Sequence, residues 1–209
     1  MAGEGDLTGP GSRLDLPAAA ALLRAGGIVA YATETFYGLG ALWNREDALR
    51  RLAGAKLRPA GKPLPLVAAD REQVAEVAAG LEGLAERLAS RFWPGPLTLV
   101  LPAAPGLSPA ITAGTGTVGI RIPGWAPARA LASAAGGALV STSANLSGGP
   151  PPVAAGDLEP ELLSRIDGVL DTGPAPGGRP STVVRIGPEG PELVRAGAVA
   201  WEAVRAAVR

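Results

Sequence analysis

Short apolar segments alternate along the chain with longer segments whose apolar residues recur at helical spacing. The short segments are bounded by glycine, proline and other turn residues, which is typical of buried strands. We predict strands at 28–31, 64–69, 97–101, 117–122, 138–141, 169–171, 181–186 and 192–195. We predict helices at 17–26, 45–55, 71–79, 81–92, 126–135, 157–166 and 198–208. Because strands and helices mix throughout with no linker between them, the pattern predicts one α/β domain with a twisted central sheet.

Capping residues define several of these boundaries. Pro17 suits the first turn of its helix, and the Gly26-Gly27 pair suits the helix end. Asn44 and Asp70 are N-cap residues for the helices that follow them. Segments 33–40 and 102–116 are interpreted as loops, and 93–96 (Trp-Pro-Gly-Pro) as a rigid turn.

Polar loops follow several of the predicted strands. Segments 33–40, 141–145 and 172–180 are rich in hydroxyl, amide and glycine residues, and Arg121 lies at the end of its own strand. In open α/β sheets, ligand-binding loops gather at strand ends, and such loops present several donors to phosphate oxygens. Taken singly, each loop is also compatible with an ordinary turn, and Arg121 with a surface ion pair.

The residue types that are missing limit the chemistry. The chain has no cysteine and no histidine, which excludes thiolate nucleophiles, a Ser-His-Asp triad and Cys/His zinc sites. The remaining groups suit phosphate handling by positioning and charge neutralisation. Among 19 basic residues only Lys56 and Lys62 are lysines, and both lie in one Pro/Gly-rich segment. Because lysine supplies a compact point charge that arginine does not, this segment is a candidate functional site, with an exposed loop as the alternative.

Charge and hydropathy narrow the class of protein further. The net charge is zero, which disfavours a non-specific nucleic-acid binder, although a local basic cleft is compatible with it. No apolar run is long enough for a membrane span, and the acidic first residues do not form a secretory leader. We expect a flexible tail over 1–12, a domain over 13–209 and a cytoplasmic location.

Six motifs, in order, carry a resemblance to a known family. They are Tyr31-Ala32-Thr33-Glu34-Thr35-Phe36-Tyr37-Gly38-Leu39-Gly40, Lys56-Leu57-Arg58-Pro59, Trp93-Pro94-Gly95-Pro96-Leu97-Thr98, the segment 117–123, Ser143-Ala144-Asn145-Leu146-Ser147-Gly148 and Pro180-Ser181-Thr182-Val183-Val184. Arg195 and Gly197 add a closing R-x-G. In this order the motifs resemble those of the YrdC/Sua5 family over roughly residues 13–209.

The resemblance implies both a fold and an activity. The fold is a twisted open mixed sheet flanked by helices, with a large concave cleft. The activity is that of a nucleotidyltransferase, which makes L-threonylcarbamoyladenylate from L-threonine, bicarbonate or CO₂, and ATP, and releases pyrophosphate. Mg²⁺ accompanies ATP. The product serves N6-threonylcarbamoyladenosine formation in tRNA, so the resemblance also implies transient contact with the threonylcarbamoyl-transfer complex and, at most, weak tRNA binding.

The resemblance also assigns roles to single residues. Thr33, Arg121, Thr142 and Ser181 would contact L-threonine. Lys56, Arg58, Thr117, Ser143, Asn145 and Arg195 would contact the nucleotide, with Lys56 and Arg58 neutralising charge on the phosphates during the reaction. Two departures stand out, because Ala32 replaces the usual proline and no histidine follows the K-x-R-P motif in 62–67.

Other interpretations stay open at this point. The same cleft could bind RNA without catalysis, although aromatic residues make up only 4% of the chain. A different enzyme that handles a sugar phosphate or carbamoyl phosphate, or a structural partner with a decayed site, are further alternatives. Glu34 and Asp171 are candidate metal-side carboxylates, with a turn or capping role as the alternative.

Overall fold

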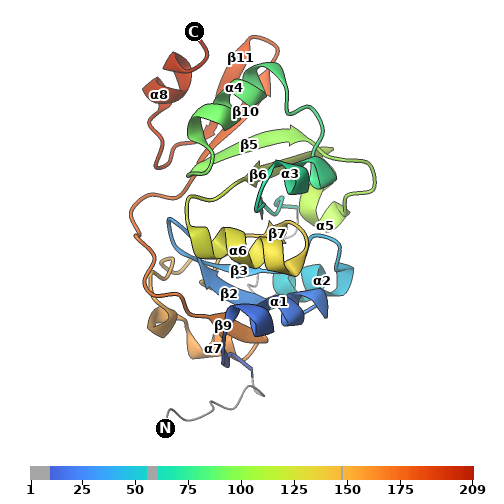
Figure 1. Cartoon of the computed structure of the whole chain (residues 1–209), viewed down its shortest axis with the longest axis vertical. Coiled ribbons are helices and arrows are strands. Elements are labelled where there is room, and N and C mark those ends of the chain that lie inside the picture. Colours follow the sequence, from blue (N-terminus) through green and yellow to red (C-terminus); the bar gives the residue numbers. More distant parts are fainter. Residues whose placement is uncertain (1–9, 56–60, 147) are drawn as a thin grey trace.

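A computed structural model describes residues 10–55, 61–146 and 148–209, and it has the predicted α/β class with mixed sheets flanked by helices. The strands form two hydrogen-bonded sheets (Figure 1), where the sequence predicted one. The five-stranded sheet has the order β1 (Arg13–Leu14), β9 (Gly168–Leu170), β2 (Val29–Ala32), β3 (Tyr37–Gly40), β8 (Thr142–Ser143). The six-stranded sheet has the order β11 (Gly190–Arg195), β10 (Thr182–Gly187), β5 (Leu97–Pro102), β6 (Thr117–Arg121), β4 (Leu66–Val67), β7 (Leu139–Val140).

Both sheets mix parallel and antiparallel pairs. β1, β9 and β2 run parallel, whereas β2, β3 and β8 pair antiparallel. In the other sheet, β10 pairs parallel with β5, β4 pairs parallel with β6, and the remaining neighbours are antiparallel. The helices are α1 (Leu16–Arg24), α2 (Glu46–Ala55), α3 (Arg71–Val77), α4 (Gly83–Phe92), α5 (Pro109–Thr112), α6 (Ala126–Ala135), α7 (Pro160–Leu163), α8 (Trp201–Ala206) and a 3₁₀ turn, Ala155–Asp157.

Side-chain caps account for two helix starts that the sequence predicted. The Asp15 carboxylate accepts a hydrogen bond from the Ala18 N–H at 2.8 Å and begins α1, and Gly26 follows its end at φ +88°. Asp70 caps α3 in the same way by accepting from the Gln73 N–H at 2.9 Å. The prediction for Asn44 is wrong, because α2 begins at Glu46 and Asn44 lies in the turn before it.

The interpretation of 33–40 as a loop is wrong for its second half. Residues 37–40 form β3, which pairs with β2 so that Ala32 lies opposite Tyr37 and Val29 opposite Gly40. Glycine is a poor strand former, so propensity argues against a strand here. Packing decides the outcome, since a Cβ at Gly40 would lie 2.7 Å from the Tyr31 ring. The glycines let β3 lie tightly against its neighbours.

Proline explains several other differences from the predicted boundaries. The strand expected at 64–69 is reduced to β4, because Pro65 has no N–H. The helix expected at 157–166 is a 3₁₀ turn followed by α7, which starts at Pro160. Segment 102–116 contains the short helix α5, with Ser108 as its cap and Pro109 in its first turn.

The closing helix is shorter than expected, because 198–199 are held against β10.

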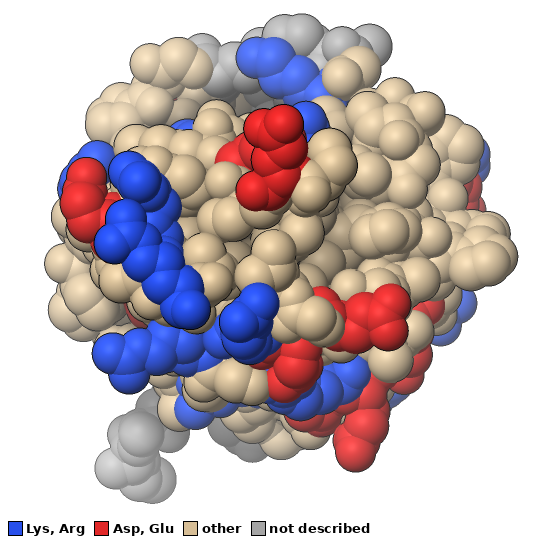
Figure 2. All heavy atoms as spheres, turned by 90° about the horizontal axis from the view of Figure 1, so that it is seen from above, with Lys and Arg blue, Asp and Glu red and all other residues tan. Residues whose placement is uncertain are grey.

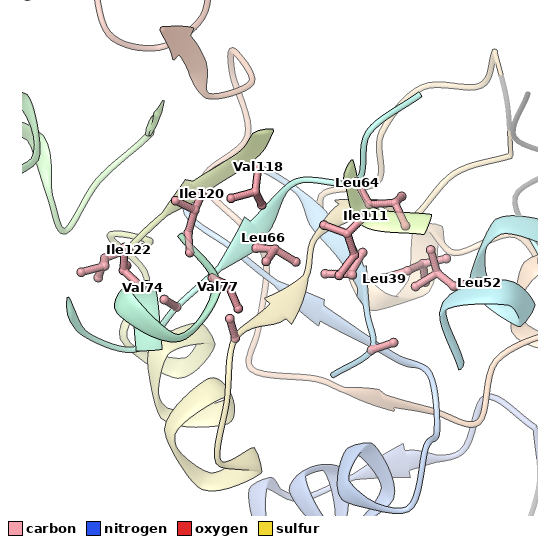
Figure 3. Packing of buried hydrophobic residues seen from close by; sticks show 14 of the residues in the cluster. Leu39, Leu52, Leu64, Leu66, Val74, Val77, Ile111, Val118, Ile120 and Ile122 are labelled. Carbon is pink, nitrogen blue, oxygen red and sulfur yellow. The ribbon is translucent and has the colours of Figure 1, made fainter. Parts of the chain in front are cut away.

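The core joins the two sheets. One buried cluster combines Leu39 of β3 and Leu52 of α2 with Leu66 of β4 and Ile120 of β6 (Figure 3). A second cluster is centred on α1 and α6, which pack on each other through small and aliphatic side chains such as Leu23. Burial of this apolar area is the main stabilising term of the fold. Every helix in the described part of the chain is too short to cross a lipid bilayer.

Besides the connection from β3 to β4, which contains α2, the chain passes between the sheets at two polar segments. β7 belongs to the six-stranded sheet and β8 to the five-stranded sheet, and Ser141 alone separates them. The Ser141 N–H donates to the Pro65 carbonyl oxygen at 2.8 Å, which anchors this crossing. Residues 171–181 make a second crossing, from β9 to β10. The predicted tail 1–12 lies mostly outside the described residues, while Gly11 and Ser12 hydrogen bond to Ile166 and Val169.

Gly197 allows the chain after β11 to lie directly on β10. The Ala198 N–H donates to the Pro180 carbonyl oxygen at 2.8 Å, and the Thr182 hydroxyl bonds with the backbone of Val199. A Cβ at Gly197 would lie 2.3 Å from the Pro180 oxygen and 2.4 Å from the Thr182 nitrogen. Both obstacles are backbone atoms, so relief requires a shift of the strand itself.

We expect Gly197→Ala to destabilise the protein by about 3 kcal/mol or more, because the added methyl overpacks two backbone segments. Gly54→Ala is the matched control, since Gly54 lies in α2 and, among the described residues outside its own helix backbone, no atom lies within 4 Å of a new Cβ. That substitution should stabilise the protein by about 0.5–1 kcal/mol through helix propensity. Urea unfolding of both variants measures the difference, and equal stability of the two would contradict the packing argument.

Candidate active site

A cleft of about 840 Å³ opens between the two sheets. Its walls come from the β2–β3 turn, from the crossing at 141–145, and from the exposed faces of β5, β6, β10 and β11. The volume is near the upper end of the range for sites that hold one small ligand. The cleft therefore has room for an amino acid together with a nucleotide.

Residues that the sequence singled out meet in this cleft although they are far apart along the chain. The described candidates all line it: Thr33, Thr117, Arg121, Thr142, Ser143, Asn145, Ser181 and Arg195. Lys56 and Arg58 lie outside the described residues. Pro63, shortly after them, lines the cleft, whereas Lys62 is exposed and does not.

Arg121 is a buried cation at the inner end of the cleft. Its side chain is 6% exposed, and its Nε donates to Glu34 Oε1 at 3.0 Å. It is thus a buried ion pair, in contrast to the surface pair considered from the sequence. A buried guanidinium requires such a partner, since an uncompensated charge in the interior is strongly destabilising. In the described part of the chain its two terminal nitrogens have no protein acceptor.

Ser181 connects three strands beside Arg121. Its hydroxyl bonds with the Thr98 hydroxyl at 2.9 Å and accepts from Arg195 Nη2 at 3.0 Å. Arg195 also donates to the Ser181 carbonyl oxygen from Nη2 at 2.7 Å. Burial, and then the positive charge of Arg121, lower the pKa of the Arg195 guanidinium. Two cations therefore face the same part of the cleft, and the Ser181 hydroxyl is bonded to one of them, Arg195.

Thr33 organises the turn that carries Glu34. Its hydroxyl donates to the Phe36 carbonyl oxygen at 2.8 Å and accepts from the backbone N–H groups of Thr35 and Phe36 at 3.3 Å. These bonds close the turn between β2 and β3. Thr33 therefore has a local structural role besides its place in the cleft wall.

The crossing between the sheets presents an amide and two hydroxyls. β8 pairs with β3, which places Thr142 opposite Leu39 and Ser143 opposite Gly38. Asn145 donates from Nδ2 to the carbonyl oxygens of Leu146 and Gly149 at 2.8 and 2.7 Å. Its Oδ1 is buried and lacks a hydrogen-bond partner among the described residues. A buried unpaired acceptor is unusual in a folded protein and is consistent with a position that a ligand donor fills.

Tyr37 connects the second crossing to the five-stranded sheet. Its hydroxyl lies 3.1 Å from Asp171 Oδ1 and 2.9 Å from the Gly173 carbonyl oxygen. Burial and the bond to Asp171 raise the pKa of Tyr37 to about 12, so the phenol stays protonated over the working range of pH. Arg13 contacts the other oxygen of Asp171 at 3.3 Å. Asp171 is therefore occupied by protein partners.

Several residues of the cleft wall had no role assigned from the sequence, among them Thr98, Gly119 and Arg185. Thr98 is 2% exposed and lines the cleft from β5, and Gly119 and Arg185 line it from β6 and β10. Thr98 is the polar position among leucines in 97–101, and strand alternation indicates that it faces away from them. Arg185 alternates in the same way with the buried Val184, and it lies on the same face as Val183, which also lines the cleft. Such polar positions within a strand indicate which face of the strand lines the cleft, whereas the candidates from the sequence came mainly from loops at strand ends.

The two departures from the family pattern have simple structural settings. Ala32 is 1% exposed, ends β2 and pairs with Tyr37, so the β2–β3 turn forms without the proline. In the segment without histidine, Pro63 and Pro65 line the cleft. Their rings offer an apolar surface in this stretch of the wall.

Surface charges are mixed on the end of the molecule that Figure 2 shows. Basic and acidic side chains occur together on this face, with a broad uncharged area between them. This differs from the continuous basic surface of non-specific nucleic-acid binders. Among the described residues no group of three or more aspartates and glutamates could hold a metal ion. Glu34 and Asp171, the two candidate metal-side carboxylates, are each paired with an arginine.

Comparison with known proteins agrees with the motif pattern. The sequence model of the Sua5_yciO_yrdC family, described as telomere recombination, matches residues 21–197. The threonylcarbamoyl-AMP synthase of Bacillus subtilis is 42% identical over 191 residues, which cover 91% of this chain and 55% of that protein. The synthase of Idiomarina loihiensis is 38% identical over 163 residues, which cover 76% of this chain and 86% of that protein.

Solved structures show the same fold. Sua5 of P. abyssi in complex with L-threonine superimposes with a TM-score of 0.88 at 38% identity, over 92% of this chain and 57% of that one. YciO of E. coli gives a TM-score of 0.79 at 25% identity, over 88% of this chain and 90% of that one. The chain spans about half the length of the B. subtilis and P. abyssi proteins that it matches. On these grounds the chain belongs to the Sua5/YciO/YrdC family.

Proposed function

We propose that this chain synthesises L-threonylcarbamoyladenylate from L-threonine, bicarbonate or CO₂, and ATP, and releases pyrophosphate. The observation that carries the proposal is the convergence of eight candidate residues from separate motifs on one cleft. Relatives across most of the chain are threonylcarbamoyl-AMP synthases, and a structural neighbour, Sua5 of P. abyssi, is a complex with L-threonine. The reaction class is nucleotidyl transfer.

The inner end of the cleft suits an α-amino acid. The free terminal nitrogens of Arg121 form a fork that matches a carboxylate in a bidentate pair. Ser181 and Thr142 add hydroxyls nearby, and Thr33 belongs to the same wall. In this arrangement Arg121 binds the threonine carboxylate, and the hydroxyl residues face the substrate hydroxyl and amine.

The nucleotide would occupy the wall made by Ser143, Asn145, Thr117 and Arg195. The unpaired Oδ1 of Asn145 accepts one donor, and Ser143 and Arg195 donate to oxygens. Lys56 and Arg58 are assigned to the phosphates of the nucleotide on the basis of the sequence motif alone. A point charge and a planar fork two residues apart suit different phosphate oxygens.

The chemistry requires positioning more than covalent catalysis. The amine of threonine adds to CO₂ and loses a proton, which gives a carbamate that is short-lived in water. A carbamate oxygen then attacks the α-phosphorus of ATP, the bond from that phosphorus to the bridging oxygen breaks, and pyrophosphate leaves. A cleft that holds both reactants and excludes water favours this step. Arginine and lysine side chains offset the charge that develops on the phosphates.

Magnesium would enter as part of the nucleotide substrate. Magnesium prefers few protein ligands, retains waters and binds substrate phosphates. The described residues are consistent with that arrangement, because they form no acidic cluster, and Glu34 and Asp171 are each paired with an arginine. In a cytoplasmic setting the adenylate would then pass to the complex that modifies tRNA.

We expect pyrophosphate release to require L-threonine and bicarbonate together. The reason is that the carbamate, which forms only from both, is the attacking group. A coupled pyrophosphate assay with each substrate omitted in turn checks this expectation. Equal release without threonine would rule out the proposed synthase.

Ser143→Ala should weaken ATP binding roughly tenfold, because one hydrogen bond to a charged group is lost. Its thermal stability should be nearly unchanged. Asn145→Ala should lower both ATP affinity and thermal stability, since its amide also holds Leu146 and Gly149. Calorimetry and thermal melts separate the two effects. Ser133→Ala, on the exposed part of α6, is the control and should alter neither.

Lys56→Arg should reduce kcat by roughly 100-fold, by analogy with the loss of one charge-stabilising donor. The chain uses arginine at nearly every other basic position, so composition alone marks this substitution as harmless. Arginine is longer and planar and fits poorly between phosphate oxygens. Lys62→Arg is the matched control, because Lys62 is exposed and does not line the cleft. Parental turnover by Lys56→Arg would show that position 56 supplies only positive charge.

A further inference from the structure

Glu34 is a largely buried carboxylate that the proposed reaction does not use. It follows Thr33 in the β2–β3 turn, and its side chain is 12% exposed. Its Oε1 accepts from Arg121 Nε, and Glu34 is not among the residues that line the cleft. Among the residues that line the cleft, Arg121 is the one to which the Glu34 carboxylate is hydrogen bonded.

The pairing of the two side chains is one-sided. A bidentate pair would use both carboxylate oxygens and two guanidinium nitrogens. Here Glu34 Oε1 meets only Nε at 3.0 Å, and Oε2 is buried without a hydrogen-bond partner among the described residues. The arginine is held from its side, which leaves both terminal nitrogens for a group in the cleft. The carboxylate of a ligand in the cleft can pair with these two terminal nitrogens.

The charge balance of the cleft gives Glu34 a second effect. Arg195 faces the same region, and the charge of Arg121 acts on it. Of the hydrogen-bond partners that the described structure gives these two arginines, Glu34 is the one with a negative charge. Within the described residues, Arg195 hydrogen bonds to the two oxygens of Ser181. Glu34 thus offsets one of two neighbouring positive charges before any ligand arrives.

We propose that Glu34 is a positioning residue for recognition of the substrate's carboxylate: it holds the guanidinium of Arg121 side-on, so that both terminal nitrogens face the cleft. The inference rests on the proposed function, in which Arg121 binds the carboxylate of the amino acid. It adds that the orientation of Arg121 depends on the length of the Glu34 side chain.

The test compares two ligands that differ only at the carboxylate. L-threonine and L-threoninamide are titrated by calorimetry, without ATP, into the parent protein, Glu34→Asp and Glu34→Gln. Glu34→Asp keeps the charge but withdraws it by one methylene, so threonine affinity should fall roughly 10- to 100-fold. Glu34→Gln keeps the length and an acceptor oxygen and should lose less. Threoninamide should bind the parent more weakly, and neither substitution should change its affinity.

Controls distinguish positioning from general damage. ATP affinity of Glu34→Asp, which keeps the charge, should stay near the parental value. Glu86→Gln, on the exposed pair with Arg71, is the matched control and should change no binding constant. A variant that binds threonine and threoninamide with the same proportional loss has a structural defect, and this result overturns the inference. Parental threonine affinity in both Glu34 variants overturns it as well.

The outcome for the parent protein tests the proposed function separately. A parent that binds threonine and threoninamide equally well does not use Arg121 for the carboxylate, which overturns the proposed substrate site together with this inference. A parent that prefers threonine, combined with Glu34 variants that keep this preference, overturns the role of Glu34 alone.

Discussion

Two sheets share one hydrophobic core in this protein, and they separate where the chain crosses from one sheet to the other. The shared core sets the distance between the sheets, because Leu39 and Leu66 belong to the same buried cluster. The crossings at Ser141 and at 171–181 cannot pair fully in either sheet, so they carry polar side chains. The cleft lies at this junction, and its polar wall follows from the topology of the sheets.

Glycine at a few positions lets neighbouring segments approach one another closely at the junction of the two sheets. Gly40 accommodates the Tyr31 ring, and Gly197 lets the segment after β11 lie on Ser181. That contact places Arg195 within hydrogen-bond distance of both oxygens of Ser181. The R-x-G motif is therefore one structural unit, in which the glycine permits the approach that the arginine then uses.

The cleft is polar, but its positive charge is limited, because a carboxylate and hydroxyl oxygens partner its two arginines. Arg121 forms an ion pair with Glu34, and the guanidinium of Arg195 donates hydrogen bonds to the oxygens of Ser181. Such a site attracts anions while its cations stay ordered. The two carboxylates that were candidates on the metal side, Glu34 and Asp171, are each paired with an arginine.

Local signals were sufficient for the α/β class and for much of the element order. The helix start at Pro17, the Asp70 cap and the apolar strand 97–101 were assigned from their own neighbours, and the structure confirms those elements. Elements that depend on distant contacts were missed. β3 looked like a loop because Gly38 and Gly40 have low strand propensity, and β8 was hidden in a Ser/Thr segment.

The sequence by itself determined which side chains are available for chemistry, and their order in six motifs determined the family. Only the tertiary structure decided how those side chains meet. The contact between Arg121 and Glu34 joins residues 87 positions apart, and the bond between Thr98 and Ser181 joins residues 83 positions apart. Neither pairing has a local signal, because strand order and register bring the partners together. Composition limits the reaction, whereas sheet topology determines where the reactive groups lie.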